Sequence, residues 1–218
     1  MTYMKLLLTS TGITNKTISD KFFEMVGKKP QDITLAFIPT AVNVSSNPNK
    51  RWMIDNIIRL DAMSIGSIDI VDFSAIPKDM WLPRLQRADV IFVEGGTPSY
   101  LISEMKKAGF DRLLLRGLED KLYVGCSAGS NVLGEVVIKS SKEAPGYIKE
   151  DGFGIVQFSI RPHFFREDKV QFSEDVIADF AKKYNSDFYA IDDESAIAVE
   201  DNEVTIVSEG RWKKFSKS

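Results

Sequence analysis

The first two-thirds of the chain alternates short apolar runs with amphipathic segments, and this alternation limits the fold more than any other feature. The runs Thr34–Ile38 and Val90–Val93 are apolar apart from Thr34, as expected for strands that are covered on both faces of a sheet. The segments between such runs carry apolar residues at three- and four-residue spacing, which is typical of helices. The pattern predicts βαβ units in a three-layer α/β/α fold with a mainly parallel central sheet.

Residue ranges follow from the same periodicity. The strands expected in this part are Lys5–Thr9, Ile33–Ile38, Ile68–Val71, Val90–Val93 and Tyr123–Cys126. The helices expected between and after them are Thr17–Val26, Lys50–Met63, Leu101–Ala108, Asp111–Glu119 and Phe172–Tyr184. Near the end we expect strands Phe188–Ile191, Ala196–Val199 and Val204–Val207, the last two as a C-terminal β-hairpin. The polar stretch Lys139–Gly154 is expected to be a loop or a short hairpin bordering the functional site.

Composition is that of an ordinary globular domain. The chain has 218 residues, of which 44% are hydrophobic and 27% charged, and we expect one domain spanning residues 1–218. A formal charge of -3 gives no electrostatic reason to expect a nucleic-acid partner. The apolar runs are too short for a membrane span or a signal peptide. A single cysteine cannot form an internal disulfide, so we expect a cytoplasmic protein.

One segment carries a candidate nucleophile. The sequence from Leu122 to Leu133 is an apolar strand-like run that breaks at Gly-Cys-Ser-Ala-Gly and resumes as a helix-like run. A serine between two glycines at a strand-to-helix turn can expose its hydroxyl, because Gly125 and Gly129 lack the Cβ atoms that would crowd the bend. Ser127 is therefore the candidate nucleophile of such an elbow. Cys126 lies one position too early and is expected to pack in the core.

A serine hydroxyl needs a base and the base needs an orienting group. His163, the chain's one histidine, is the candidate base, and Pro162 stiffens the chain before it. A candidate acid follows the strand Phe188–Ile191. In an extended chain Asp192 and Glu194 would share one face, so periodicity alone leaves both open.

A glycine pair, Gly95-Gly96, ends the run Val90–Val93 and precedes a helix that begins near Pro98. A backbone amide in such a turn can approach a ligand closely, which suits an oxyanion donor. The functional segments then occur in the order serine, histidine, acid, whereas α/β-hydrolases have the order serine, acid, histidine. An ordinary esterase or lipase fold is therefore disfavoured.

In these segments and their order, the chain resembles the peptidase E family, which comprises aspartyl dipeptidases and their cyanophycinase relatives. The resemblance spans nearly the whole chain. It implies a class I glutamine amidotransferase-like (flavodoxin-like) fold and a serine peptidase without metal or cofactor. By motif, it implies Ser127 as nucleophile, His163 as general base and Glu194 as orienting acid. The amides of Gly96 and Ala128 would form the oxyanion hole.

What the resemblance implies for the substrate is a short peptide, with Asp-X dipeptides as one candidate class. Family members commonly have asparagine after the glycine pair, where this chain has Thr97, so we expect substrate contacts to differ there. Arg161 and Arg166 flank His163 and are candidate cations for a substrate carboxylate. An isopeptidase or esterase using the same triad and a non-catalytic binding domain are the alternatives, and the assembly is expected to be a monomer or a homodimer.

Overall fold

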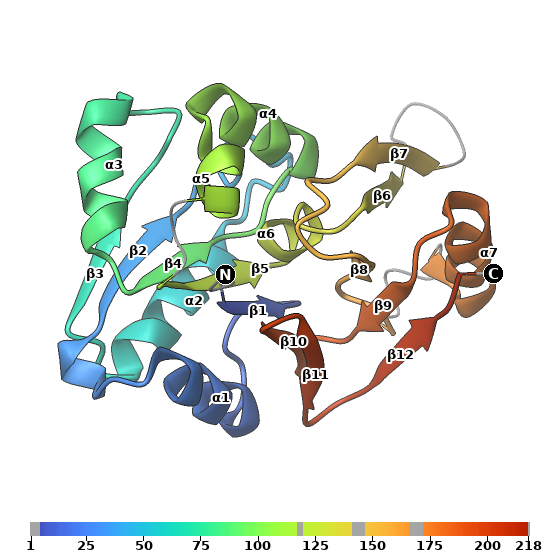
Figure 1. Cartoon of the computed structure of the whole chain (residues 1–218), viewed down its shortest axis with the longest axis horizontal. Helices are drawn as coiled ribbons and strands as arrows, with labels where there is room; N and C mark the ends of the chain where they lie inside the picture. The colour runs from blue at the N-terminus through green and yellow to red at the C-terminus, as the bar shows by residue number, and fades with distance from the viewer. Residues whose placement is uncertain (1–4, 117–119, 141–146, 166–171, 218) are drawn as a thin grey trace.

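A mainly parallel, seven-stranded sheet forms the centre of the molecule (Figure 1). The structure is a computed structural model and describes residues 5–116, 120–140, 147–165 and 172–217. The strand order in the sheet is β11-β10-β1-β5-β4-β2-β3. Five strands run parallel: β1 (Lys5–Thr9), β2 (Thr34–Ile38), β3 (Ser67–Ile70), β4 (Val90–Val93) and β5 (Leu122–Cys126). The expected α/β architecture with a mainly parallel sheet is confirmed.

The C-terminal hairpin extends the sheet at one edge. Strands β10 (Ser195–Glu200) and β11 (Glu203–Ser208) pair antiparallel, and β10 also pairs antiparallel with β1. Asp201 and Asn202 connect the two strands with positive φ angles of 50° and 68°, a conformation that aspartate and asparagine tolerate better than most residues. The predicted hairpin is therefore present, and it places the chain that precedes β10 beside β1.

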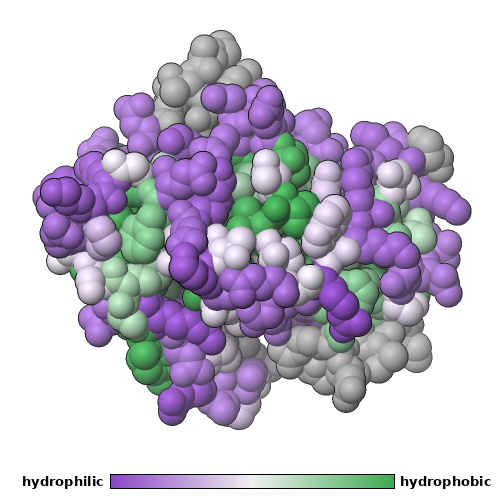
Figure 2. All heavy atoms as spheres, turned by 90° about the horizontal axis from the view of Figure 1, so that it is seen from below, coloured by the Kyte–Doolittle hydropathy of each residue, from purple (hydrophilic) through white to green (hydrophobic). Residues whose placement is uncertain are grey.

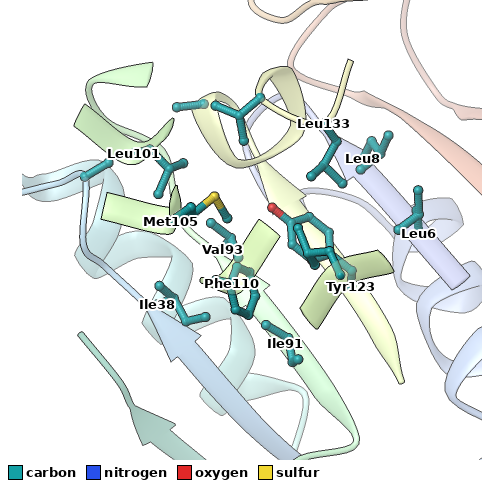
Figure 3. Close-up of a cluster of buried hydrophobic side chains, with 14 of the residues drawn as sticks. Leu6, Leu8, Ile38, Ile91, Val93, Leu101, Met105, Phe110, Tyr123 and Leu133 are labelled. Atoms are coloured by element: carbon teal, nitrogen blue, oxygen red, sulfur yellow. The ribbon is translucent and has the colours of Figure 1, made fainter. Parts of the chain in front are cut away.

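Helices cover both faces of the sheet, as the three-layer prediction requires. One face packs against α1 (Lys16–Val26) and α2 (Arg51–Ala62), and the other against α3 (Lys78–Arg87), α4 (Pro98–Ala108) and α5 (Phe110–Arg116). Figure 3 shows the second face, where Leu101 and Met105 of α4 lie against strand side chains such as Val93. Because neighbouring residues of a strand point to opposite faces, fully apolar strands supply both cores.

Local sequence sets where the helices begin and end. Asn15 caps α1 by accepting a hydrogen bond from the amide of Ile18, and Gly27 ends the helix in the left-handed conformation at φ 68°. Helix α4 begins with Pro98 at its first turn and ends at Gly109, φ 70°. Start and stop signals therefore lie at the ends of both helices, and the periodic apolar residues between them are what predicted each helix.

A second, smaller sheet lies beside the central one. It has the order β12-β9-β8, with β8 (Ser159–Arg161) parallel and β12 (Trp212–Phe215) antiparallel to β9 (Phe188–Ile191). Helix α7 (Glu174–Tyr184) packs on it through Ile177, Phe180 and Ala181. A separate hairpin consists of β6 (Val136–Ser140) and β7 (Tyr147–Asp151). It overlaps the stretch Lys139–Gly154, which was expected to be a loop or short hairpin, but begins before it.

Some elements do not follow from the sequence pattern. The short 3-10 helix Pro30–Asp32, helix α3 and strands β8 and β12 were not among the expected elements. Helix α3 contains Pro83, a helix breaker, and buries only Trp81 and Leu85. Strand β8 has three residues, and β12 buries only Phe215, so neither has a periodic pattern long enough to be read.

Figure 2 shows one face on which hydrophilic residues surround smaller hydrophobic areas. Within the described residues, no helix is both long and apolar enough to cross a bilayer. The same residues contain no cluster of three or more histidine, cysteine, aspartate or glutamate side chains placed to hold a metal ion.

Candidate active site

The candidate residues gather at the carboxyl ends of the parallel strands β1, β4 and β5. These strands are adjacent in the sheet, and the register pairs Thr9 with Cys126 and Val93 with Gly125. Ligands and reacting groups of open α/β sheets collect at this edge, where the loops after the strands meet. The turns after all three strands contribute to the arrangement described below.

Ser127 occupies a sharp, strained turn between β5 and the short helix α6 (Ala128–Asn131). Its backbone has φ 50° and ψ -104°, which is unfavourable for any residue other than glycine. Hydrogen bonds fix it on both sides: its amide donates to the carbonyl of Thr9 at 3.1 Å, and its carbonyl accepts from the amide of Asn131 at 2.9 Å. The surrounding structure thus holds the serine in the conformation of a nucleophile elbow.

The two flanking glycines allow strand and helix to approach closely. A Cβ atom at Gly125 would lie 2.6 Å from the amide nitrogen of Ser130, and one at Gly129 would collide with the carbonyl of Val93. Ser130 has little room to move, because its hydroxyl donates to the carbonyl of Thr9 at 2.7 Å. Side chains at either glycine would therefore force the elbow apart.

His163 lies directly against Ser127. Its Nε2 is 2.8 Å from the Oγ of Ser127, a hydrogen-bond distance. The histidine follows β8 and has a positive φ of 57°. The next residue, Phe164, is buried and donates its amide to the carbonyl of Ile191 at 3.0 Å, which ties the segment to the end of β9.

Asp193 is the acid that contacts the histidine. Its Oδ1 lies 2.7 Å from the Nδ1 of His163. The expectation that Glu194 occupies this position is not met: the Glu194 carboxylate accepts a hydrogen bond from the Asn15 side chain at 3.0 Å at the surface. Asp192, the alternative, accepts from the backbone amides of Glu194 and Arg211.

The reason for this difference is the backbone between β9 and β10. Residues 192–194 are not extended, because 193 and 194 form a turn. Side-chain alternation holds only within a strand, so the two-face argument that favoured Asp192 and Glu194 does not apply here. The Asp192 carboxylate stabilises the turn, and the turn directs Asp193 toward the histidine.

The acid is held in its ionised form. Burial would raise the pKa of Asp193, but the hydrogen bond and charge of His163, with further hydrogen bonds from Thr11 and Ser10, hold that pKa well below its usual range. An ionised carboxylate only accepts hydrogen bonds, so the Nδ1 of His163 must carry the proton. In the neutral ring Nε2 is then free to accept the hydroxyl proton of Ser127.

The turns around Ser127 contain two backbone amides with no acceptor in the described part of the chain. In the turn after β4, Gly95 donates to the carboxylate of Glu94 at 2.6 Å and Thr97 donates to the carbonyl of Ala41 at 3.2 Å. The amides of Gly96 and Ala128 donate to no acceptor among the described residues. A Cβ atom at Gly95 would lie 3.1 Å from the Cβ of Ser127, which places this turn against the elbow. The arrangement suits binding of an oxyanion.

A buried polar network contacts the turn that follows β4. Glu94 is fully buried and accepts hydrogen bonds from the amide of Gly95 and, at 2.9 Å, from Asn56. Burial raises the pKa of Glu94, and hydrogen bonds from the Cys126 thiol, Gly95 and Asn56 only partly oppose this. Burial, followed by the neighbouring Glu94 charge, also raises the pKa of Cys126 well above its usual value. A buried, protonated thiol is a poor nucleophile, in agreement with its expected core position.

The candidate substrate-binding residues lie apart from this hydrogen-bonded set. Thr97 follows the glycine pair, and its hydroxyl lies 3.5 Å from the carbonyl of Val44. Arg161 is buried, stacks 3.4 Å above the ring of Phe172 and has a pKa lowered to about 10 by desolvation. Among the described residues, its Nε has no hydrogen-bond partner. Arg166 lies outside the described residues.

Comparison with known proteins shows the family to which this chain belongs. A model of peptidase family S51 matches residues 6–207. The chain belongs to this family. It is a serine peptidase, and the alignment of the family across almost the whole chain confirms the predicted relationship to peptidase E.

Individual proteins similar to this chain are distant in sequence. The uncharacterized peptidase Lmo0363 of Listeria monocytogenes is 26% identical over 185 residues, which cover 80% of this chain and 85% of the relative. Peptidase E of Streptomyces coelicolor is 32% identical over 91 residues, covering 40% of this chain and 37% of that protein.

Solved structures show the same fold. A protein from Listeria monocytogenes EGD-e superposes with a TM-score of 0.74 at 24% identity, over 95% of this chain and 99% of its own. A peptidase from an acI-B1 actinobacterium has a TM-score of 0.62 at 17% identity, over 99% of this chain and 95% of its own.

Proposed function

We propose that this S51 peptidase hydrolyses short peptides through an acyl-enzyme on Ser127, with His163 as general base and Asp193 as the group that orients it. The observation that carries the proposal is the continuous hydrogen-bonded chain from Ser127 Oγ to His163 Nε2, 2.8 Å, and from His163 Nδ1 to Asp193 Oδ1, 2.7 Å. Nucleophile, base and acid in this order form the unit that activates a serine hydroxyl at neutral pH.

The reaction proceeds in two halves. Ser127 Oγ attacks the carbonyl carbon of the scissile bond while its proton passes to His163 Nε2, and the amides of Gly96 and Ala128 bind the oxyanion that forms. The carbon–nitrogen bond then breaks as His163 returns the proton to the leaving amine. Water attacks the acyl-enzyme, gives a proton to His163 and releases the acid, and Ser127 regains its proton. Asp193 remains ionised throughout and stabilises the imidazolium.

Dipeptides with a free amino terminus are the proposed substrate class, with Asp-X peptides as a candidate within it. The support is the family relationship, including the named peptidase E relative, and the buried guanidinium of Arg161, which forms no ion pair with a carboxylate in the described part of the chain. A guanidinium left without an acid is suited to bind the carboxylate of a ligand. Thr97, beside the oxyanion turn, is the second proposed substrate contact.

The test compares two adjacent residues on one substrate panel. Purified protein is assayed against dipeptides that include Asp-X, their N-acetylated forms, β-linked Asp-Arg and simple esters. Ser127→Ala should abolish turnover, whereas Cys126→Ala, altered one position earlier on the same turn, should largely retain it. Full turnover by Ser127→Ala would refute the mechanism, and turnover of esters or β-linked substrates without any dipeptide would refute the proposed substrate class.

A further inference from the structure

Two hydroxyl groups at the end of β1 converge on the same oxygen of Asp193 that faces His163. The Oγ of Ser10 donates to Asp193 Oδ1 at 2.8 Å, and the Oγ1 of Thr11 donates to it at 2.6 Å. The Nδ1 of His163 reaches that oxygen at 2.7 Å. Neither hydroxyl was singled out by the sequence motifs, and neither contacts Ser127 Oγ.

Ser10 also binds the main chain of His163. The amide of His163 donates to the Oγ of Ser10 at 2.8 Å, so one hydroxyl group accepts from the base and donates to the acid. Ser10 is completely buried, which keeps water from replacing either bond. This contact also stabilises the positive φ of 57° at His163, a conformation that needs support from its surroundings.

The preceding residue connects the same strand to the nucleophile. The carbonyl of Thr9 accepts the amide of Ser127 at 3.1 Å. Three consecutive residues, Thr9, Ser10 and Thr11, therefore contact the backbone of Ser127, the backbone of His163 and the carboxylate of Asp193. These three groups come from distant parts of the chain, and the last residue of β1 with the two residues after it holds them together.

We propose that Ser10 and Thr11 are positioning residues, which fix the Asp193 carboxylate in the orientation that keeps the proton of His163 on Nδ1. The inference rests on the proposed serine mechanism. A carboxylate has about four acceptor positions and rotates freely unless donors fill them. Two fixed hydroxyl donors on Oδ1 oppose that rotation and hold this oxygen in the position where it accepts the Nδ1–H of His163. The imidazole then keeps the tautomer in which Nε2 can accept the serine proton.

Thr11 offers a matched pair of substitutions. Thr11→Val keeps the shape of the side chain and removes the donor, whereas Thr11→Ser keeps the donor and removes a methyl group. We expect Thr11→Val to lower kcat roughly tenfold with KM unchanged within about twofold, because a positioning contact acts on the chemical step. Thr11→Ser should stay within about threefold of the parent. Ser10→Ala should lose more, roughly thirtyfold, because it removes a contact to both acid and base.

The imidazole itself supplies a readout that needs no substrate. His163 is the chain's one histidine, so protein labelled with 15N-histidine gives a single set of ring signals. With the ring neutral, the parent and Thr11→Ser should show only the tautomer protonated at Nδ1. Thr11→Val and Ser10→Ala should show a mixture that includes the tautomer protonated at Nε2.

The two measurements separate this inference from the mechanism on which it rests. If the parent protein turns over substrate but Thr11→Val and Ser10→Ala keep both kcat and the Nδ1 tautomer, the positioning role is wrong and the triad remains. A loss of folding in Ser10→Ala leaves the Thr11 pair to decide. If Ser127→Ala retains turnover, the mechanism fails, while the tautomer populations still report whether the hydroxyl groups orient the ring.

Discussion

Replacing Asp193 by asparagine tests the acid of the triad most directly. Two unit charges 2.7 Å apart attract by roughly 6 kcal/mol at an effective dielectric constant of about 20. The side chains of His163 and Asp193 are 23% and 32% exposed, so solvent screening reduces this value. We expect Asp193→Asn to lose about 4 to 5.5 kcal/mol of transition-state stabilisation, which is about 10³- to 10⁴-fold in kcat.

Glu194→Gln is the matched control for this change. It is the same acid-to-amide substitution one residue later in the same turn. In the described part of the chain, the Glu194 carboxylate accepts a hydrogen bond from the Asn15 side chain, which also donates to the Glu194 backbone carbonyl. We expect its kcat to stay within about threefold of the parent. Steady-state kinetics on one dipeptide, with far-UV circular dichroism to confirm folding, compares the two variants. An equal loss in both, or retention of more than a tenth of the turnover in Asp193→Asn, would refute the assignment.

Three further substitutions examine the parts around the triad. Cys126→Ala should keep kcat within about threefold, and iodoacetamide should leave the parent protein active. The reason is that the Cys126 thiol is buried and its pKa is raised. Rapid inactivation by alkylation would contradict this. Because burial raises the pKa of Glu94, its stabilising contribution is complete below about pH 4 and is lost as the pH rises through the folded-state value. The unfolding free energy of Glu94→Gln, measured by urea titration, should therefore rise relative to that of the parent as the pH increases from 4 toward neutrality. Parallel pH profiles of the two unfolding free energies would contradict this expectation. Gly125→Ala should cost about 2 to 3 kcal/mol of unfolding free energy, since its Cβ would lie 2.6 Å from the Ser130 amide; an unchanged urea midpoint would show that the elbow can relax.

Sequence reasoning located the parts of the site that depend on local backbone rules. The elbow at Ser127 follows from a strand, two glycines and a helix, and all of these signals are contiguous in the chain. The glycine pair before Thr97 is similar, because a turn after a buried strand needs small residues where backbone approaches backbone. The strands β2, β4 and β5 were recognisable for the same reason, because each is a short, mostly apolar run that is buried along most of its length.

The acid could not be chosen in this way, because its direction depends on a turn. Asp192, Asp193 and Glu194 are chemically alike, and only the hydrogen bonds that Asp192 makes to the turn decide which carboxylate reaches His163. Ser10 was missed because a hydroxyl residue after a strand is common. One signal was present: a polar segment directly after the first apolar strand lies at the carboxyl edge of the sheet, where active sites form.

The geometry of the proposed triad depends on how the two sheets pack against each other. Ser127 is fixed to the central sheet through Thr9, whereas His163 follows β8 of the smaller sheet and is tied to the end of β9 by the bond from Phe164 to Ile191. Asp193 lies in the turn between β9 and β10, which is where the chain passes from the smaller sheet to the central one. A shift of one sheet against the other would therefore separate base from nucleophile before either sheet unfolded. The contacts that Thr9, Ser10 and Thr11 make with all three groups oppose such a shift.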